Sequence, residues 1–172
     1  MRLIHLVVRA LALIFPAYCA NATPVIAGGG FPLDFGKMFV DGKPILGKNK
    51  TIRGFFAGLA MGTAVGFIES LFFSGSIFFN YPPTIGFFLS LGALFGDLIV
   101  SFVKRRLGFA SGDLLPFFDQ TSFVIGAILF SLPVSINLLS IEIVITILLI
   151  TPPIHLLTNF VAYKLGLKSN PW

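Results

Sequence analysis

A stripe of charged and hydroxyl side chains lies near the end of an apolar run in the middle of the chain. Asp97, Ser101 and Lys104 are spaced four and three residues apart, and Arg105 follows directly. On a helix the first three lie within about 60° of one another, with Arg105 at the margin of the same face. Carboxylates on Mg²⁺, with lysine and arginine beside them, commonly bind polyphosphates and stabilise nucleotidyl transfer. The stripe therefore indicates a metal site next to a phosphate-binding group.

The consecutive cations Lys104, Arg105 and Arg106 also have a simpler interpretation, which is an anchor at the cytoplasmic end of a membrane helix. Asp97 changes this interpretation, because an unpaired charge inside an apolar span costs about 3 kcal/mol or more. A carboxylate that lies one and two turns before the cations favours the metal and phosphate site over a topological anchor alone.

A second aspartate, Asp119, directly precedes the next apolar run. Its carboxylate has two interpretations that the sequence leaves open. It caps the following helix by accepting backbone N–H groups, or it ligates a metal ion together with Asp97.

The composition indicates that these groups lie in a membrane protein. Of the 172 residues, 56% are hydrophobic and 11% are charged, whereas about a quarter of the residues in a soluble domain are charged. The single cysteine excludes a disulfide framework and a cysteine-based zinc site. The net charge of +5 comes from cations at the ends of apolar runs, which indicates topology and phosphate chemistry and predicts no nucleic-acid partner.

The apolar runs predict an all-α polytopic membrane protein in which residues 1–172 form a single membrane-embedded domain. Five transmembrane helices are expected at about residues 3–20, 54–79, 84–103, 121–139 and 141–162. The first run partly imitates a signal peptide, but Arg9 interrupts its apolar core, so it is interpreted as a span.

A long loop, residues 21–53, connects the first two predicted helices. It is rich in Phe and other apolar residues, which are expected to pack or to lie on lipid. Within it, Gly42 to Asn49 nearly matches the phosphate loop G-x-x-x-x-G-K-[ST]. That match is disfavoured because Asn49 replaces the final hydroxyl residue and Pro44 removes an amide.

Two further helical patterns bear on packing. The second predicted span carries a glycine every four residues, at Gly54, Gly58, Gly62 and Gly66. Such a groove admits another helix closely, and an internal neighbour is favoured over a second copy of the chain in a homodimer. In the last span His155 and Asn159 share a face, which is more typical of a helix-to-helix hydrogen bond than of a ligand.

Five spans place loop 21–53, loop 104–120 and the C-terminal tail on one side of the membrane. That side holds ten of the twelve Lys and Arg residues. By the positive-inside rule it is cytoplasmic. The candidate active site is therefore expected on the cytoplasmic face of the cell membrane.

Several short motifs carry a resemblance that covers almost the whole chain. They include Pro16-Ala-Tyr18, Phe31-Pro-Leu-Asp-Phe-Gly-Lys37, Gly96-Asp97-Leu98, Lys104-Arg105-Arg106, Asp119-Gln120, His155-Leu-Leu-Thr-Asn159 and Pro171-Trp172. With these motifs the chain resembles the archaeal CDP-archaeol synthase family. The stretch around Asp97 is also similar to the signature of phosphatidate cytidylyltransferases, but Gln120, Ser122 and Asn49 depart from the residues usual in those relatives.

The resemblance implies transfer of the CMP group of CTP to the phosphate of 2,3-di-O-geranylgeranylglyceryl phosphate, giving CDP-unsaturated archaeol and pyrophosphate. CTP, an isoprenoid ether lipid phosphate and membrane lipid would be the partners, and Mg²⁺ the cofactor. Asp97 and Asp119 would ligate the metal. The polyphosphate would contact Ser101, Lys104, Arg105, Lys50 and Arg53, with Asn21 and Thr51 as further polar contacts.

The alternative from another class is a small membrane transporter or ion channel, because Glu69 and Asp97 lie inside apolar runs. Against it, the two halves of the chain show no repeat, and the charges gather at one surface. Another lipid-phosphate enzyme is the nearer alternative.

Overall fold

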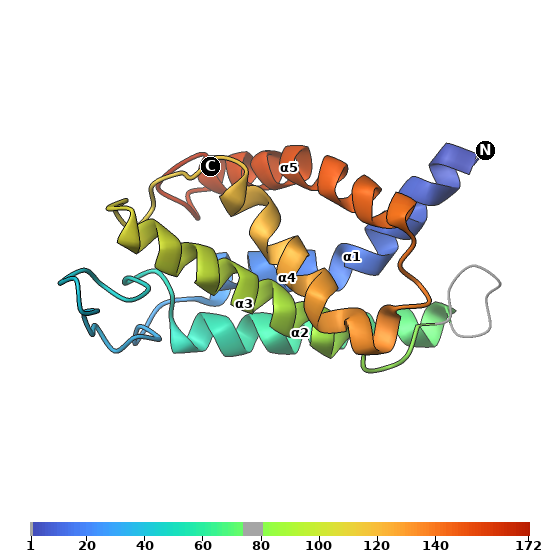
Figure 1. Cartoon of the computed structure of the whole chain (residues 1–172), viewed down its shortest axis with the longest axis horizontal. Helices are drawn as coiled ribbons and strands as arrows, with labels where there is room; N and C mark the ends of the chain where they lie inside the picture. The colour runs from blue at the N-terminus through green and yellow to red at the C-terminus, as the bar shows by residue number, and fades with distance from the viewer. Residues whose placement is uncertain (1, 74–80) are drawn as a thin grey trace.

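A computed structural model describes residues 2–73 and 81–172. The described residues form helices α1 (Arg2–Ala27), α2 (Ile52–Phe73), α3 (Ile85–Arg106), α4 (Phe118–Ser135) and α5 (Ile141–Lys164) (Figure 1). All five of these helices are long and apolar enough to cross a membrane. The prediction of an all-α polytopic membrane protein with five spans is confirmed.

The helix ends differ from the predicted spans, most of all in α1. This helix continues to Ala27 instead of ending at residue 20, so Asn21 lies within it and the connecting segment is residues 28–51. The polar residues after Ala20 suggested a loop, but they stay helical because α2 packs along this part of α1. At the other ends, α3 continues to Arg106, α4 begins at Phe118 and α5 continues to Lys164, while the predicted end of the second span at residue 79 lies outside the described residues.

The glycine face of α2 lies between α1 and α3. A Cβ atom added to Gly58 would lie 2.5 Å from the Ala20 carbonyl oxygen, and one added to Gly66 would lie 2.3 Å from Gly86 Cα. Because both neighbours belong to the same chain, the preference for an internal neighbour is confirmed. The glycine groove is filled by α1 and α3 and does not serve a second copy.

A second close contact joins α3 to α4. A Cβ atom added to Gly92 would lie 2.2 Å from the Gly126 carbonyl oxygen, and one added to Gly96 would lie 2.3 Å from the Ser122 carbonyl oxygen. Gly96 precedes Asp97, and Ser122 lies one helical turn after Asp119. The close approach of the two helices therefore brings the two predicted metal ligands to the same region.

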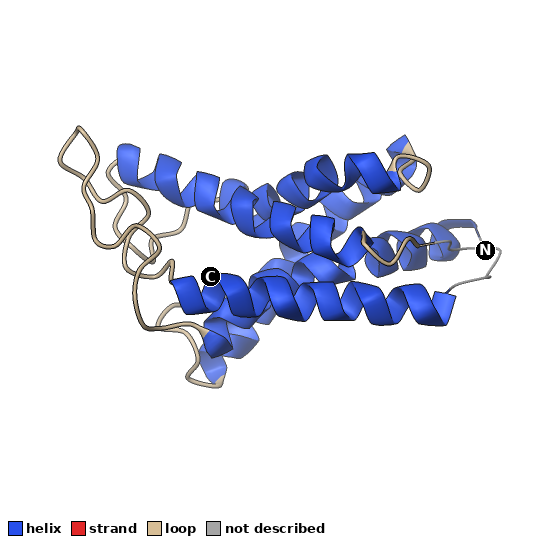
Figure 2. Cartoon of the chain, turned by 90° about the horizontal axis from the view of Figure 1, so that it is seen from below, coloured by secondary structure: helices blue, strands red, loops and turns tan. Residues whose placement is uncertain are grey.

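The connecting segments 28–51 and 107–117 and the C-terminal segment 165–172 lie at one end of the helix bundle, opposite the N-terminus (Figures 1 and 2). Ten of the twelve Lys and Arg residues belong to these segments or to the helix ends beside them. The cations are thus concentrated at one end of the membrane-spanning bundle.

Segment 28–51 is held together by the Asp34 carboxylate. Asp34 is buried and accepts hydrogen bonds from the N–H groups of Gly36 at 3.0 Å, Leu46 at 2.9 Å and Gly47 at 2.9 Å. Burial alone would raise the pKa of Asp34, but donation by Gly47, Leu46 and Gly36 lowers this pKa below its ordinary value. The segment therefore has a fixed conformation without helix or strand.

The apolar residues of this segment only partly pack on the bundle. Phe39 packs edge-on against Phe102 of α3 with 5.3 Å between ring centroids, and the Arg106 guanidinium lies over both rings. Exposed apolar side chains lie nearby, at Phe31, Phe35, Met38 and Val40.

Replacing Gly62 by alanine is expected to destabilise the bundle. The new Cβ atom would lie 2.1 Å from Ser90 Oγ and 2.6 Å from the Pro16 carbonyl oxygen, and such overpacking costs about 1–3 kcal/mol. Thermal unfolding of the purified protein in detergent micelles measures the loss. Ala64→Val, on the exposed face of the same helix, is the matched control, and equal unfolding midpoints for the two variants would contradict the packing described.

Replacing Asp34 by asparagine is expected to loosen segment 28–51 fully above about pH 4, with an effect that diminishes as the pH falls from there through the lower folded pKa. Because the folded pKa of Asp34 is depressed, its contacts stabilise the segment fully above the ordinary aspartate pKa of about 3.9. This stabilisation is lost as the pH falls through the folded pKa. Hydrogen exchange of the Leu46 and Gly47 amides in wild type and variant, compared across this pH range, measures the effect. A difference in exchange that does not change with pH would argue against a carboxylate clamp.

Candidate functional site

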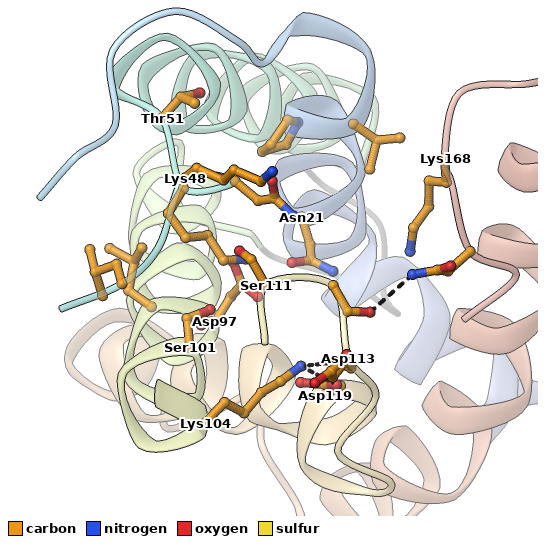
Figure 3. A pocket seen from close by; sticks show the side chains of 18 of the residues that line it. Asn21, Lys48, Thr51, Asp97, Ser101, Lys104, Ser111, Asp113, Asp119 and Lys168 are labelled. Carbon is orange, nitrogen blue, oxygen red and sulfur yellow. Dashed lines mark hydrogen bonds and ion pairs between the residues drawn. The ribbon is translucent and has the colours of Figure 1, made fainter. Parts of the chain in front are cut away.

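A cavity of about 490 Å³ lies at the cation-rich end of the bundle (Figure 3). All five described helices and the three segments at this end contribute to its walls. Its polar lining comprises Asn21, Lys48, Asn49, Lys50, Thr51, Asp97, Ser101, Lys104, Arg105, Ser111, Asp113, Asp119, His155, Asn159, Lys168, Ser169 and Asn170. Every predicted site residue except Arg53 therefore lines one cavity.

Asp97 forms an ion pair with Lys50 inside the cavity. Lys50 is held in place by its own backbone, because its N–H donates to Gly47 O at 3.2 Å and its carbonyl accepts from Leu33 N at 2.7 Å. The side chains of Lys50 and Asp97 remain 27% and 35% exposed, so an incoming ligand can reach both. The segment before α2 thus supplies the counter-charge for the aspartate of α3.

Asp119 forms the second ion pair, with 2.7 Å between its Oδ2 atom and Lys104 Nζ. The Lys104 ammonium also donates to the carbonyl oxygen of Asp113. Asp119 does not cap α4, because the helix begins at Phe118 and Asp119 lies in its first turn. Its Oδ2 atom instead accepts from Leu115 N at 2.7 Å, before the helix. The capping interpretation is therefore wrong, and the carboxylate faces the cavity.

Arg105 is a buried cation with incomplete pairing. Its residue surface is 5% exposed, and its Nε atom has no hydrogen-bond partner within residues 2–73 and 81–172. Its Nη1 atom lies against Gly47, where an added Cβ atom would be 3.6 Å away. A buried guanidinium without a carboxylate partner is a favourable place for an anionic ligand.

The charge of the cavity lining also favours an anion. The lining contains Lys48, Lys50, Lys104, Arg105 and Lys168 against three aspartates, Asp97, Asp113 and Asp119. Five positive groups and three negative groups leave an excess of two positive charges. A ligand with several negative charges would balance this excess.

The remaining predicted contacts have structural partners. Ser101 Oγ donates to the carbonyl oxygen of Asp97 at 2.8 Å, and Thr51 Oγ1 accepts from Gly54 N at 3.1 Å at the start of α2. Arg53 is exposed and lies outside the cavity lining. Its guanidinium donates to Ala27 O at 2.9 Å and to Gly28 O, so it satisfies carbonyl groups at the end of α1.

Asp97 and Asp119, the two predicted metal ligands, both line this cavity. Each uses its Oδ2 atom for a lysine, and Oδ1 of each has no hydrogen-bond partner among the described residues. No group of three or more His, Cys, Asp or Glu side chains suited to a metal occurs among these residues. Mg²⁺ commonly binds one or two carboxylates together with substrate phosphates. The donor set therefore fits Mg²⁺ that is bound jointly with a polyphosphate.

Other cavity residues were not predicted as site residues. His155 lies 5.7 Å from Phe123, centroid to centroid, and interacts with Asn159 on its own helix rather than on a neighbour. Ser111, Asp113 and Lys168 come from the segments after α3 and α5 and face the same cavity (Figure 3). These segments lack helical periodicity, so the sequence offered no geometric signal for their residues.

Comparisons with known proteins identify the family of the chain. A family model described as "CarS-like: CDP-archaeol synthase" matches residues 3–172. The chain is 46% identical over 180 residues to a CDP-archaeol synthase of Methanococcus aeolicus, with 100% of both chains covered. It is 44% identical over 168 residues to one of Pyrococcus furiosus, covering 98% of this chain and 99% of that protein.

A solved structure is also similar. It is described as "an intramembrane enzyme for archaeal membrane lipids biosynthesis" and has a TM-score of 0.76 and 38% sequence identity. The match covers 87% of this chain and 92% of that chain. The fold and the sequence thus indicate the same group of proteins.

Replacing Lys50 by methionine is expected to tighten binding of Mn²⁺ alone by roughly 2- to 10-fold, because the ammonium group competes with a cation for Asp97. Asp97→Asn should weaken that binding. Titration of free Mn²⁺ by electron paramagnetic resonance measures both effects. Lys37→Met, which removes an exposed lysine outside the cavity, is the matched control. Equal Mn²⁺ affinities for the two lysine variants would contradict the competition.

Proposed function

Because the chain belongs to the CDP-archaeol synthase family, we propose that it transfers the CMP group of CTP to the phosphate of 2,3-di-O-geranylgeranylglyceryl phosphate. The products are CDP-unsaturated archaeol and pyrophosphate. The observation that carries this proposal is the cavity at one end of a membrane bundle, in which two lysine-paired aspartates lie beside the buried, incompletely paired Arg105.

The cation-rich end of the bundle is the cytoplasmic end in this proposal, and the membrane is the cell membrane. The positive-inside rule supports this orientation, since ten of the twelve Lys and Arg residues lie at that end. The nucleotide then reaches the cavity from the cytoplasm, while the lipid phosphate reaches it from the bilayer. Exposed apolar side chains on all five described helices suit contact with isoprenoid chains.

The reaction is an in-line displacement at the α-phosphorus of CTP. An oxygen of the lipid phosphate forms the new P–O bond, and the bond to the pyrophosphate group breaks with its electron pair going to pyrophosphate. A phosphate monoester is largely ionised at pH 7, so no strong general base is required. Mg²⁺ on Asp97 and Asp119 would neutralise charge on the phosphate oxygens.

The basic residues of the chain bind and stabilise the polyphosphate. Lys50, Lys104 and Arg105 donate to its oxygens and stabilise the charge that develops on the leaving pyrophosphate. Before substrate binds, the ammonium groups of Lys50 and Lys104 neutralise the two aspartates. An anionic substrate draws these ammonium groups to its own oxygens, which frees both carboxylates.

The polar and structural residues have separate roles. Asn21 and Ser101 line the cavity and contact the nucleotide, and Thr51 does so while it caps α2. Arg53 joins the ends of α1 and α2 and is not assigned to the leaving group. The proposed site is built by a single chain, and a homodimer, if it forms, uses a surface other than the glycine groove of α2.

Transfer of label from α-labelled CTP to the lipid phosphate by the purified protein tests the proposal. Asp97→Asn and Asp119→Asn should each lower the rate by at least ~100-fold, since each removes a charge that the transition state requires. Chelation of divalent metal should abolish transfer. Asp41→Asn, which removes an exposed carboxylate outside the cavity, should retain activity.

The decisive negative result is a wild-type protein that binds CTP but forms no CDP-lipid from either archaetidic or phosphatidic acid. That outcome would reject the cytidylyltransferase, and ion flux across liposomes would then test the transporter alternative.

A further inference from the structure

The C-terminal segment 165–172 folds back over the cavity after α5 ends at Lys164. Gly166 has a positive φ of 72°, and Leu167 N donates to Ala162 O at 2.9 Å, so the chain reverses at the helix end. Farther along, Asn170 Nδ2 and Trp172 Nε1 both donate to Gly112 O, at 3.2 and 3.1 Å. The segment is therefore tied to the stretch that joins α3 to α4.

This fold-back places Lys168 in the cavity wall. Figure 3 shows Lys168 on the side of the cavity opposite Lys48 and Ser101. Its ammonium group donates to a main-chain oxygen of Trp172 and, within the part of the chain that the structure describes, pairs with no Asp or Glu side chain. The nearby Lys164 differs, because it is exposed and lies over the Phe160 ring at 5.5 Å, outside the cavity lining.

The electrostatic surroundings of Lys168 disfavour its charge in the absence of a ligand. Burial is the main cause that lowers the Lys168 pKa, and the positive charges of Lys50 and Lys104 lower it further, while Asp119 and Asp97 act in the opposite direction. Lys168 is thus close enough to sense both ion pairs of the site. A lysine held there without an Asp or Glu partner is a favourable place for an anionic ligand.

We propose that Lys168 is a substrate-binding residue that donates to a phosphate oxygen of a substrate, and that Asn170 and Trp172 position it through Gly112. This inference rests on the proposed function, in which both substrates carry phosphate. On binding, the Lys168 ammonium exchanges the main-chain oxygen of Trp172 for a phosphate oxygen. The phosphate is then held from two sides, by Lys48 and Lys50 on one and by Lys168 on the other.

The shared chemistry is a phosphate oxygen, and two substrates could supply it. If the CTP polyphosphate is the ligand, loss of Lys168 raises KM for CTP and weakens binding of inorganic pyrophosphate. If the lipid phosphate is the ligand, the same change raises KM for the lipid alone. Either result supports the proposal and assigns the source.

The test compares Lys168→Gln with Lys168→Arg and with the matched control Lys164→Gln. A charged hydrogen bond of this kind predicts a rise in one KM of about 10- to 100-fold for Lys168→Gln. Lys168→Arg should recover much of the loss, and Lys164→Gln should behave as wild type. Trp172→Phe removes the indole donor to Gly112 and should raise the same KM by a smaller factor with kcat retained.

A second measurement uses the wild-type protein and does not depend on how the variants fold. Lysine methylation followed by mass spectrometry should show Lys168 protected by CTP, by pyrophosphate or by the lipid phosphate, while Lys164 stays equally reactive. If none of these ligands protects Lys168, the proposal is overturned. Equal KM values for Lys168→Gln and Lys164→Gln would also overturn it.

The failure of this inference is distinguishable from failure of the proposed function. CDP-lipid formation that is unaffected by Lys168→Gln rejects only the role of Lys168. If pyrophosphate protects Lys168 from methylation in a protein that forms no CDP-lipid, the phosphate contact is supported and the transferase is rejected.

Discussion

The site depends on how two carboxylates are kept at the end of a membrane bundle. A carboxylate in this setting is costly unless a cation or hydrogen-bond donors neutralise it. Asp97 and Asp119 each meet this requirement with one lysine, and these lysines come from different parts of the chain. Lys104 lies on α3 and reaches the start of α4, whereas Lys50 lies before α2 and reaches the middle of α3. The two pairs thereby hold helices α3 and α4 and segment 28–51 in one arrangement.

These ion pairs require helix axes that approach closely, and the glycines permit this approach. Side chains larger than hydrogen at Gly92 and Gly96 would meet the backbone of α4, and at Gly58 and Gly66 they would meet α1 and α3. Glycine is otherwise unfavourable within a helix by roughly 1 kcal/mol relative to alanine. Its repeated use indicates that close contact matters more here than intrinsic helix propensity. In lipid this contact is also the main attraction between apolar helices, since burial from water contributes nothing there.

Periodic features were predictable from the sequence, and features fixed by loop geometry were not. The stripe of Asp97, Ser101 and Lys104 follows from helical spacing, and all three line the cavity as that spacing requires. Composition could not show that α1 continues past Ala20, because tertiary packing against α2 overrides the local loss of apolar residues. Arg53 illustrates the same limit. Its charge suggested a phosphate contact, but from the start of α2 its guanidinium reaches carbonyl groups at the end of α1. Residue type gives the chemistry available, but only the neighbours decide which chemistry is used.

The charge balance of the cavity connects its ion pairs to the proposed binding of a polyphosphate. Lys50 and Lys104 are paired with aspartates, while Arg105 lacks a partner at Nε and Lys168 has only a main-chain oxygen of Trp172 among the described residues. A polyphosphate therefore meets two basic groups whose contacts are incomplete before it displaces any existing ion pair. In the proposed reaction, contact with these groups offsets the cost of separating the lysines from the aspartates, and the anion makes the aspartates available. In this proposal the groups that neutralise the carboxylates of the cavity are also the ones that make them available in response to substrate.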